Sequence, residues 1–213
     1  MELINYLNSY FLTTQQLLEQ AKVSTDQLAH FQRQGVMPQC SYKLNLQLSS
    51  DSFFGLHSEQ QTIEYYAKGY VSWLAVLQSE PAVDAVFAIF SDRYRHTIEQ
   101  LKTQGHRTEN TKLTSEFASH LQQEWLHFLA GIYGLCTKTG LPEDIAAKEF
   151  AVIQINELTA LTELSAAQRD RLTAAVDLLD AASSLFAPHE RLKSSRHRLV
   201  NEVRRTYKLQ NAH

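Results

Sequence analysis

The chain has 213 residues, of which 44% are apolar, and it carries a formal net charge of -3. A chain of this size and apolar content can bury a sizeable core as one domain, or as one domain with a small subdomain. The small negative charge argues against a protein that binds a polyanion or a membrane surface over its whole face. Only 7 glycines and 4 prolines are present, which favours long helices over a turn-rich sheet protein.

The apolar runs and the cysteines indicate a cytoplasmic protein. No apolar run approaches the ~20 residues that a helix needs to cross a bilayer. The first residues, MELINYLNSYFL, lack the cationic start and the small-residue cleavage site of a signal peptide. Cys40 and Cys136 are too few for a disulfide framework, so we expect two free thiols in a reducing compartment.

The segment from Leu12 to Pro38 has the layout of a helix-turn-helix. Its pattern predicts a short helix over residues 14–21, a turn, and a second helix that is capped by Ser24 or Thr25 and ends at Gly35. The segment resembles, without a gap, the N-terminal half of MerR-type DNA-binding domains. The matching positions are Leu17, Val23, Ser24, Leu28, Phe31, Arg33, Gly35 and Pro38.

The same segment lacks most of the cations that DNA reading requires. Lysines and arginines that neutralise phosphates supply most of the affinity for DNA, and a helix in the major groove needs side chains that reach base edges. The second helix offers Asp26, Gln27, Ala29 and His30 where MerR-type proteins usually carry arginines, and the expected wing is represented only by residues 41–44. We therefore favour a structural or small-molecule-facing helix-turn-helix and expect no nucleic-acid partner. The alternative, a DNA-binding regulator, depends on Gln27, His30, Arg33 and Lys43.

Helical periodicity dominates the rest of the chain. Apolar residues that recur at three and four positions predict helices over residues 59–78, 115–136, 142–161, 165–186 and 188–209, with another that begins at Pro81. A polar run over residues 103–114 predicts a loop. We therefore expect an all-α protein of two parts: a MerR-like helix-turn-helix subdomain over residues 1–50, packed on a helical bundle over residues 51–213 with a basic C-terminal helix.

Segments spread over most of the chain resemble an uncharacterised bacterial family that is labelled as natural-product biosynthesis proteins. The segments that carry the resemblance are Ser41–Tyr42, Trp125–Cys136, Ile145–Glu149 and Ser195–Tyr207. The resemblance implies a bacterial protein with a link to secondary metabolism, but it names no reaction.

One group of polar residues has the spacing of a metal site. His120, Glu124 and His127 lie four and three residues apart, which places them along one stripe of a predicted helix. Glu124 and His127 have the Glu-x-x-His spacing of di-iron helix bundles, and Asp92 with His96 would add a carboxylate and an imidazole. That pattern requires two such motifs and two further glutamates, and only one Glu-x-x-His is present. A half-exposed polar surface is the alternative, so we name no cofactor.

The C-terminal helix carries a charge asymmetry. Arg191, Arg198 and Arg205 are spaced by seven residues along one predicted stripe. Arginines in a row can bind a phosphate or a carboxylate. The alternatives are a solvated face, or pairing with acids of the preceding helix such as Asp177 and Asp180. For an anionic ligand, a small metabolite or a carrier-bound intermediate, we predict contacts with Tyr42, Arg196, Arg198 and Arg205.

Four aromatic residues, Tyr65, Tyr66, Tyr70 and Trp73, are dense enough to form either the core or the wall of a small-molecule pocket. Because they fall at helical spacing, we expect that at least one tyrosine lies at an edge or a cavity.

The sequence thus predicts an accessory or small-molecule-binding protein of secondary metabolism. The alternatives are a MerR-like regulator with weak DNA-reading residues and a metal-dependent enzyme in a helical bundle. No catalytic residue is identified, and the oligomeric state stays open.

Overall fold

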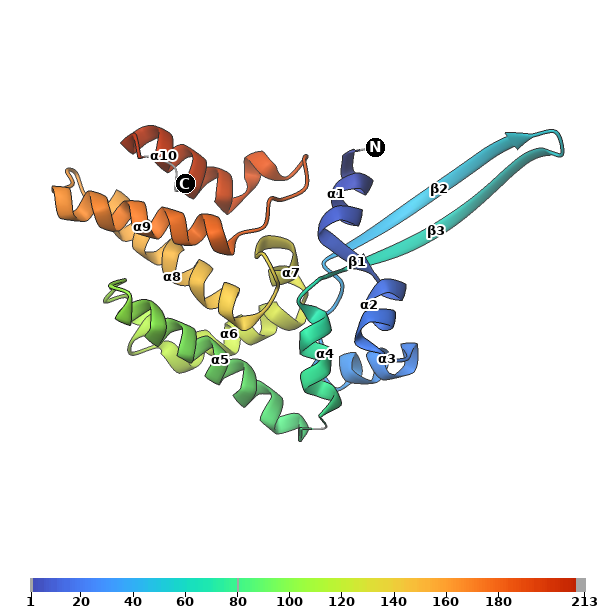
Figure 1. Ribbon diagram of the computed structural model, residues 1–213, viewed down its shortest axis with the longest axis horizontal. Helices are drawn as coiled ribbons and strands as arrows, with labels where there is room; N and C mark the ends of the chain where they lie inside the picture. The colour runs from blue at the N-terminus through green and yellow to red at the C-terminus, as the bar shows by residue number, and fades with distance from the viewer. Residues whose placement is uncertain (1, 80, 210–213) are drawn as a thin grey trace.

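A computed structural model describes residues 2–79 and 81–209, and Figure 1 shows its arrangement. The N-terminal part combines short helices with a small sheet, and the rest is a layered helical bundle. In order, the elements are α1 (Glu2–Tyr10), β1 (Phe11–Thr13), α2 (Thr14–Ala21), α3 (Thr25–Arg33), β2 (Tyr42–Ser52), β3 (Gly55–Ala67), α4 (Tyr70–Gln78), α5 (Val83–Thr103), η1 (Thr111–Leu113), α6 (Phe117–Leu129), α7 (Ile132–Cys136), α8 (Pro142–Thr159), α9 (Ala166–Ala182), η2 (Arg191–Lys193), η3 (His197–Asn201) and α10 (Glu202–Tyr207).

The expectation of an all-α protein is wrong, because the structure contains a three-stranded antiparallel sheet in the order β1-β3-β2. The helix expected over residues 59–78 is divided: its first part belongs to strand β3, and α4 begins only at Tyr70. The strand signal is the alternation of Leu44, Leu46 and Leu48 with polar residues, which has a period of two rather than 3.6. The protein is therefore mixed, although mostly helical.

The two helices expected before Gly35 are present. α2 covers the predicted residues, and α3 begins after Ser24, whose side chain accepts a hydrogen bond from the backbone N–H of Gln27. The Ser24 N–H in turn donates to the side-chain oxygen of Gln27, which completes a capping box. The turn between them contains Lys22 in the left-handed conformation (φ 55°). Local sequence thus determines the ends of both helices.

The sheet side chains divide between two cores. Tyr65 packs with Tyr6, Leu7 and Phe11 on one face of β3, and Tyr66 lies on the opposite face, in the main core. Tyr65, Tyr66, Tyr70 and Trp73 are all at most 2% exposed. The four residues do not share one helix: Tyr65 and Tyr66 belong to β3, which sends successive side chains to opposite faces, and Tyr70 and Trp73 belong to α4. No tyrosine of this group therefore lies at an exposed edge.

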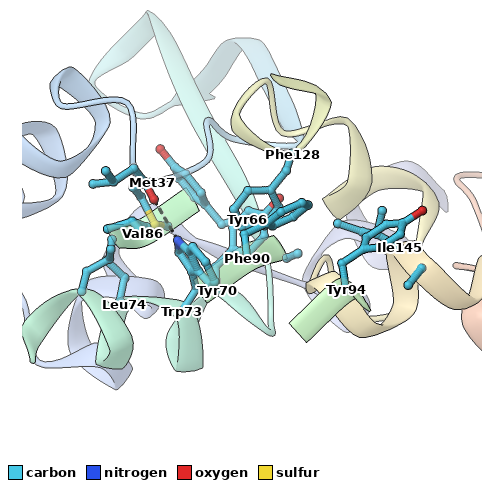
Figure 2. Close-up of a cluster of buried hydrophobic side chains, with 14 of the residues drawn as sticks. Met37, Tyr66, Tyr70, Trp73, Leu74, Val86, Phe90, Tyr94, Phe128 and Ile145 are labelled. Atoms are coloured by element: carbon cyan, nitrogen blue, oxygen red, sulfur yellow. Dashed lines mark hydrogen bonds between the residues drawn. The ribbon is translucent and has the colours of Figure 1, made fainter. Parts of the chain in front are cut away.

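The main core lies where α4, α5 and α6 meet the N-terminal part (Figure 2). The Trp73 ring contacts Phe128 edge-on at a centroid distance of 5.0 Å and lies 6.2 Å from Trp125. The Trp73 Nε1–H donates a hydrogen bond of 2.9 Å to the carbonyl oxygen of Val36. This side chain therefore joins the segment after α3 to the bundle through both packing and a buried hydrogen bond.

The central helix of the bundle is α8, which is buried on nearly all sides and packs on α5 and α9. The second core forms between α8, α9 and the C-terminal segment. The helix expected over residues 188–209 is interrupted: η2 is a short 3-10 turn, η3 is a π-helical segment, and α10 covers only the last part. Within the described residues, no helix combines the length and the apolar character that crossing a bilayer requires.

We predict that Trp73→Phe lowers the free energy of unfolding by about 3 kcal/mol. The substitution leaves the buried Val36 carbonyl without its donor, which costs about 1–3 kcal/mol, and it removes buried ring volume as well. Urea unfolding followed by far-UV circular dichroism measures the effect without relying on tryptophan fluorescence.

The matched control is Trp125→Phe. Trp125 is a neighbouring, partly buried indole, and the described residues show no hydrogen bond from its ring nitrogen. We expect this variant to lose about 1 kcal/mol, from contact area alone. Equal losses in the two variants would show that the hydrogen bond to Val36 contributes nothing.

Candidate functional site

An apolar cleft of about 350 Å³ lies between the end of α1, α7 and the end of α9. This volume lies within the range of small-molecule sites. Residues from segments that are distant in the sequence line it. They are Tyr6, Tyr10, Phe11, Ala67, Gly134, Thr137, Lys138, Asp180, Ala181, Ser183, Ser184, Leu185 and Arg196.

A glycine allows the floor of the cleft to form. A Cβ atom on Gly134 would lie 2.1 Å from Ser41 Oγ and 3.0 Å from the Tyr70 hydroxyl. A real side chain cannot occupy that space, so only glycine allows α7 to lie this close to the end of the sheet. The contact is to the loop that contains Ser41 and to α4.

Two buried hydroxyl groups at the cleft, on Tyr6 and Ser183, make no hydrogen bond of good geometry within the described part of the chain. Burial raises the pKa of Tyr6, and the neighbouring Ser184 and Tyr42 hydroxyls oppose this shift. Tyr6 and Ser183 line the cleft and are 5% and 6% exposed. The Tyr70 and Ser41 hydroxyls lie next to Gly134 and interact with each other there. A buried hydroxyl without a partner costs about 1–3 kcal/mol. These groups therefore favour a molecule in the cleft that can hydrogen-bond to them.

Charged residues gather at the α9 side of the cleft. Arg196 donates from Nη1 to the carbonyl oxygen of Asp180 at 3.0 Å and forms an ion pair with the Asp180 carboxylate. The same carboxylate accepts a bond of 2.6 Å from Arg204, which also pairs with Asp177 at 2.7 Å. Lys138 is exposed on the lining. The lining thus holds two cations and one acid, and that acid is shared with Arg204.

Only one of the four predicted ligand contacts lines this cleft. Tyr42 donates its hydroxyl to Glu190 at 2.6 Å and packs edge-on against Phe11, within the core beneath α1. Arg198 is exposed, and Arg205 pairs with Glu202 on the surface. Arg196 is the contact that reaches the cleft. Its bond to Asp180 is the acid pairing that the sequence left open as an alternative.

The predicted metal residues are separated. His120 and Glu124 are buried and adjacent on α6, with Nδ1 and Oε1 3.9 Å apart. Asp92 pairs with Arg95 on the surface, His96 bonds to Gln100, and His127 is exposed. Among the residues that the structure describes, no group of three His, Cys, Asp or Glu side chains has a metal-binding arrangement.

His120 and Glu124 instead belong to a buried hydrogen-bonded group. The Tyr133 hydroxyl donates to Glu124, and the Tyr94 hydroxyl lies 3.2 Å from His120 Nε2. Burial raises the pKa of Glu124 to about 7, although the Tyr133 bond opposes the shift. Burial also lowers the pKa of His120. Both shifts favour the neutral forms, as expected for titratable groups that are removed from water.

The residues of the DNA-reading alternative are exposed but poorly charged. Gln27, His30 and Arg33 lie on the outer side of α3, and Lys43 pairs with Glu64 at 3.5 Å. Residues 11–67, which contain α2, α3 and the sheet, carry three lysines and arginines against five acids, a net charge of -2. This balance repels a phosphate backbone.

The sequence did not indicate the hydroxyl groups of the cleft. Tyr6 and Ser183 carry no motif and stand at opposite ends of the chain, so only the tertiary fold brings them together. The sequence signal that points to this cleft is the pair of acids Asp177 and Asp180, which are predicted partners of the C-terminal arginines.

We predict that the Glu124 carboxyl makes stability depend on pH. The folded pKa of about 7 lies above the ordinary value of 4.5, so the protonated carboxyl stabilises the fold and that contribution is lost as pH rises through this window. A shift of this size corresponds to about 3 kcal/mol. Glu124→Gln keeps an oxygen that accepts the Tyr133 bond and should remove this fall, as measured by urea unfolding between pH 4.5 and 8.

The lowered pKa of His120 contributes in the opposite direction, and because His120 lies 3.9 Å from Glu124 the difference between the two profiles reports on this pair of side chains. Lys112, Lys148 and Glu149 are the charged groups that act on the carboxyl, and they are present in both. Glu163→Gln, at an exposed glutamate, is the matched control and should leave the profile unchanged. Parallel profiles for Glu124→Gln and the unmodified chain would contradict the prediction.

One family model matches most of the bundle, including the residues of α7 and α9 that line the cleft. A model described as a family of unknown function, DUF6058, matches residues 86–208, which is more than half of the chain. The match begins after the sheet, and its description has no link to natural-product biosynthesis. Comparisons with curated proteins and with solved structures found no match. The chain therefore belongs to the DUF6058 family, whose function is unknown.

Proposed function

We propose that this protein binds a small molecule in the cleft between α1, α7 and α9. The observation that carries the proposal is the apolar cleft of about 350 Å³, whose lining includes Tyr6 and Ser183 with buried hydroxyls that make no hydrogen bond of good geometry among the described residues. Buried polar groups are nearly always hydrogen-bonded. A ligand hydroxyl, carbonyl or acid group would satisfy both at once.

The remaining walls define the ligand. Tyr10, Phe11, Ala67 and Leu185 offer aromatic and apolar surface, which suits a flat or aliphatic body. Such a combination, an apolar wall with a few placed polar groups, is typical of sites for small metabolites.

The charges favour an acidic ligand. Arg196 and Lys138 lie on the lining, and the single acid there, Asp180, is already engaged by two arginines. A carboxylate or phosphate would therefore meet a small excess of positive charge. A small anionic metabolite or a carrier-bound intermediate fits this description. The sequence resemblance to natural-product biosynthesis proteins favours a secondary metabolite, for which the protein would act as an accessory.

In this proposal the segment that resembles a helix-turn-helix is a structural scaffold and does not read DNA. The order of α2, α3 and the β2–β3 hairpin supports the resemblance, because MerR-type domains also place a wing after two short helices. The net charge of -2 over residues 11–67 does not support phosphate binding. We therefore favour ligand binding over regulation by DNA contact.

We predict that the cleft binds the fluorescent probe anilinonaphthalene sulfonate, an apolar body with one negative charge. The titration uses the full chain with Phe53→Ser and Phe54→Ser, because those exposed rings offer the probe another apolar surface. Adding Ala181→Trp, at an exposed residue of the lining, should fill the cleft and weaken binding by about 10-fold or more.

Two comparisons separate the effect of the probe's charge on binding from the effect of its shape. Phenylnaphthylamine, the neutral counterpart of the probe, should bind more weakly than the sulfonate. Lys138→Gln should weaken binding of the sulfonate by about 3- to 10-fold and leave binding of the neutral probe unchanged. Arg198→Gln, at an exposed cation outside the cleft, is the matched control and should change neither. Probe binding that is insensitive to Ala181→Trp would reject the cleft as the site.

A further inference from the structure

A second hollow adjoins the cleft and is lined entirely by the segment that follows α9. Its volume is about 330 Å³. Leu185 and Arg196 line both the cleft and this hollow, so the two spaces meet at these side chains. A ligand that is longer than the cleft could therefore extend past Arg196 into the second space. We call this space the arginine hollow, and its lining consists of Leu185, Arg191, Ser194, Arg196, His197 and Asn201.

The lining of the arginine hollow, as far as the structure describes it, contains several donors and no acid. Arg191 and Arg196 are charged at every physiological pH, and the Asn201 amide can donate hydrogen bonds as well. Arg196 already pairs with Asp180, an acid of the cleft lining whose carboxylate also binds Arg204. The hollow therefore presents a positive surface to an anion.

Arg191 supplies the charge that is available to a ligand. Among the described residues it forms no ion pair, and its Nε–H donates to the Phe186 carbonyl oxygen at 3.3 Å. That bond orients the guanidinium and leaves the two Nη groups to bind an anion. Glu202 lies 3.5 Å from His197 Nε2 and also pairs with Arg205, so its charge is shared by those two side chains.

Two features of the backbone hold these donors in place. Ser194 is buried, and its Oγ donates to the Arg191 carbonyl oxygen at 2.7 Å and accepts from the His197 N–H at 3.0 Å. It thus joins η2, which carries Arg191, to η3, which carries His197. In η3 the Glu202 N–H bonds to the His197 carbonyl, five residues back rather than four. Such π-helical turns are rare and occur frequently at functional sites, and the two end residues of this one, His197 and Asn201, both line the hollow.

We propose that the arginine hollow binds the phosphate group of the ligand whose apolar body lies in the cleft, so that the ligand is an organic phosphate monoester. This inference rests on the proposed function and narrows its acidic ligand to one chemical class. A phosphate monoester carries a charge of about -1.5 to -2 at neutral pH and three terminal oxygens, whereas a carboxylate carries one charge and two oxygens. Arg191 and Arg196 match the phosphate in charge, and His197 and Asn201 supply donors for its remaining oxygens.

The test compares octyl phosphate with octyl sulfate, which has the same chain and the same number of terminal oxygens but a single charge. Each is titrated by calorimetry, below the concentration at which it forms micelles, into the full chain with Phe53→Ser and Phe54→Ser. The proposal expects octyl phosphate to bind about 10-fold or more tightly than octyl sulfate. It also expects octyl phosphate to displace anilinonaphthalene sulfonate from the cleft.

Arg191→Gln should weaken binding of octyl phosphate by about 10-fold and leave binding of anilinonaphthalene sulfonate unchanged, because Arg191 lines the hollow and not the cleft. Arg191→Lys keeps the charge and should recover part of the affinity. The matched control is Lys193→Gln, at an exposed cation of the same turn outside the hollow, which should change neither. Arg191 is exposed, so these variants should keep the far-UV spectrum of the unmodified chain.

Equal affinity for octyl phosphate and octyl sulfate would overturn the proposal, and so would equal effects of Arg191→Gln and Lys193→Gln. Either result would leave the proposed function in place if Ala181→Trp still weakens binding of anilinonaphthalene sulfonate.

Inorganic phosphate tests the hollow without the cleft. Phosphorus NMR should detect binding of this ion to the unmodified chain, and Arg191→Gln should remove that binding. Sulfonate binding that is insensitive to Ala181→Trp, together with phosphate binding that depends on Arg191, would reject the proposed function and keep the hollow as a phosphate site.

Discussion

The burial of the Trp73 indole is the constraint on which the rest of the structure depends. Its ring packs among the aromatic residues of α5 and α6, and its N–H bonds to the Val36 carbonyl just after α3. α2, α3 and the bundle therefore share one core. The neighbouring Tyr70 extends this junction, since its ring packs edge-on against Phe128.

The cleft follows from that junction. Tyr70 lies against Gly134 and Gly140, and a Cβ on either glycine would come within about 3 Å of its side chain. α7 is thereby held at the end of β3, while Lys148 donates to the Cys136 carbonyl and Ser184 to the Leu135 carbonyl. Hydrogen bonds from both α8 and the segment after α9 thus fix the floor of the cleft. The walls of the cleft meet at α7 because its backbone carbonyls accept hydrogen bonds from both of these neighbouring segments.

The starts of the helices could be predicted from the sequence, but the pairing of the strands could not. Ser24, Ser165 and Pro142 mark the starts of helices, because capping chemistry acts over three or four residues. The strand β3 was mistaken for a helix because Ile63, Tyr66 and Tyr70 recur at three and four residues, although the first two belong to a strand. The alternation in β2 carried the strand signal, but its partner is defined only by pairing across the turn.

The candidate site was harder to predict than the fold. Arg196 could be named from charge and Asp180 as its partner, because both are polar residues that stand out on neighbouring helices. The proposed roles of Tyr6 and Ser183 depend on their hydroxyls having no well-formed hydrogen bond among the described residues. Tertiary packing, rather than local sequence, determines this. The break after η2 also places Arg191 outside the helical segment that holds Arg198 and Arg205.

The attachment of α1 decides how the proposed ligand would act on the cleft. The Tyr65 hydroxyl donates to Asn8 at 2.8 Å and Lys68 donates to the Ser9 carbonyl at 2.7 Å, so both bonds tie α1 to the end of β3. The opposite wall, around Ser183 and Arg196, belongs to the bundle. A molecule that bonds to Tyr6 and Ser183 together would therefore link two walls that are held by different elements. Because each hydroxyl is buried already, its bond to such a molecule would add stability without the desolvation that an exposed group requires.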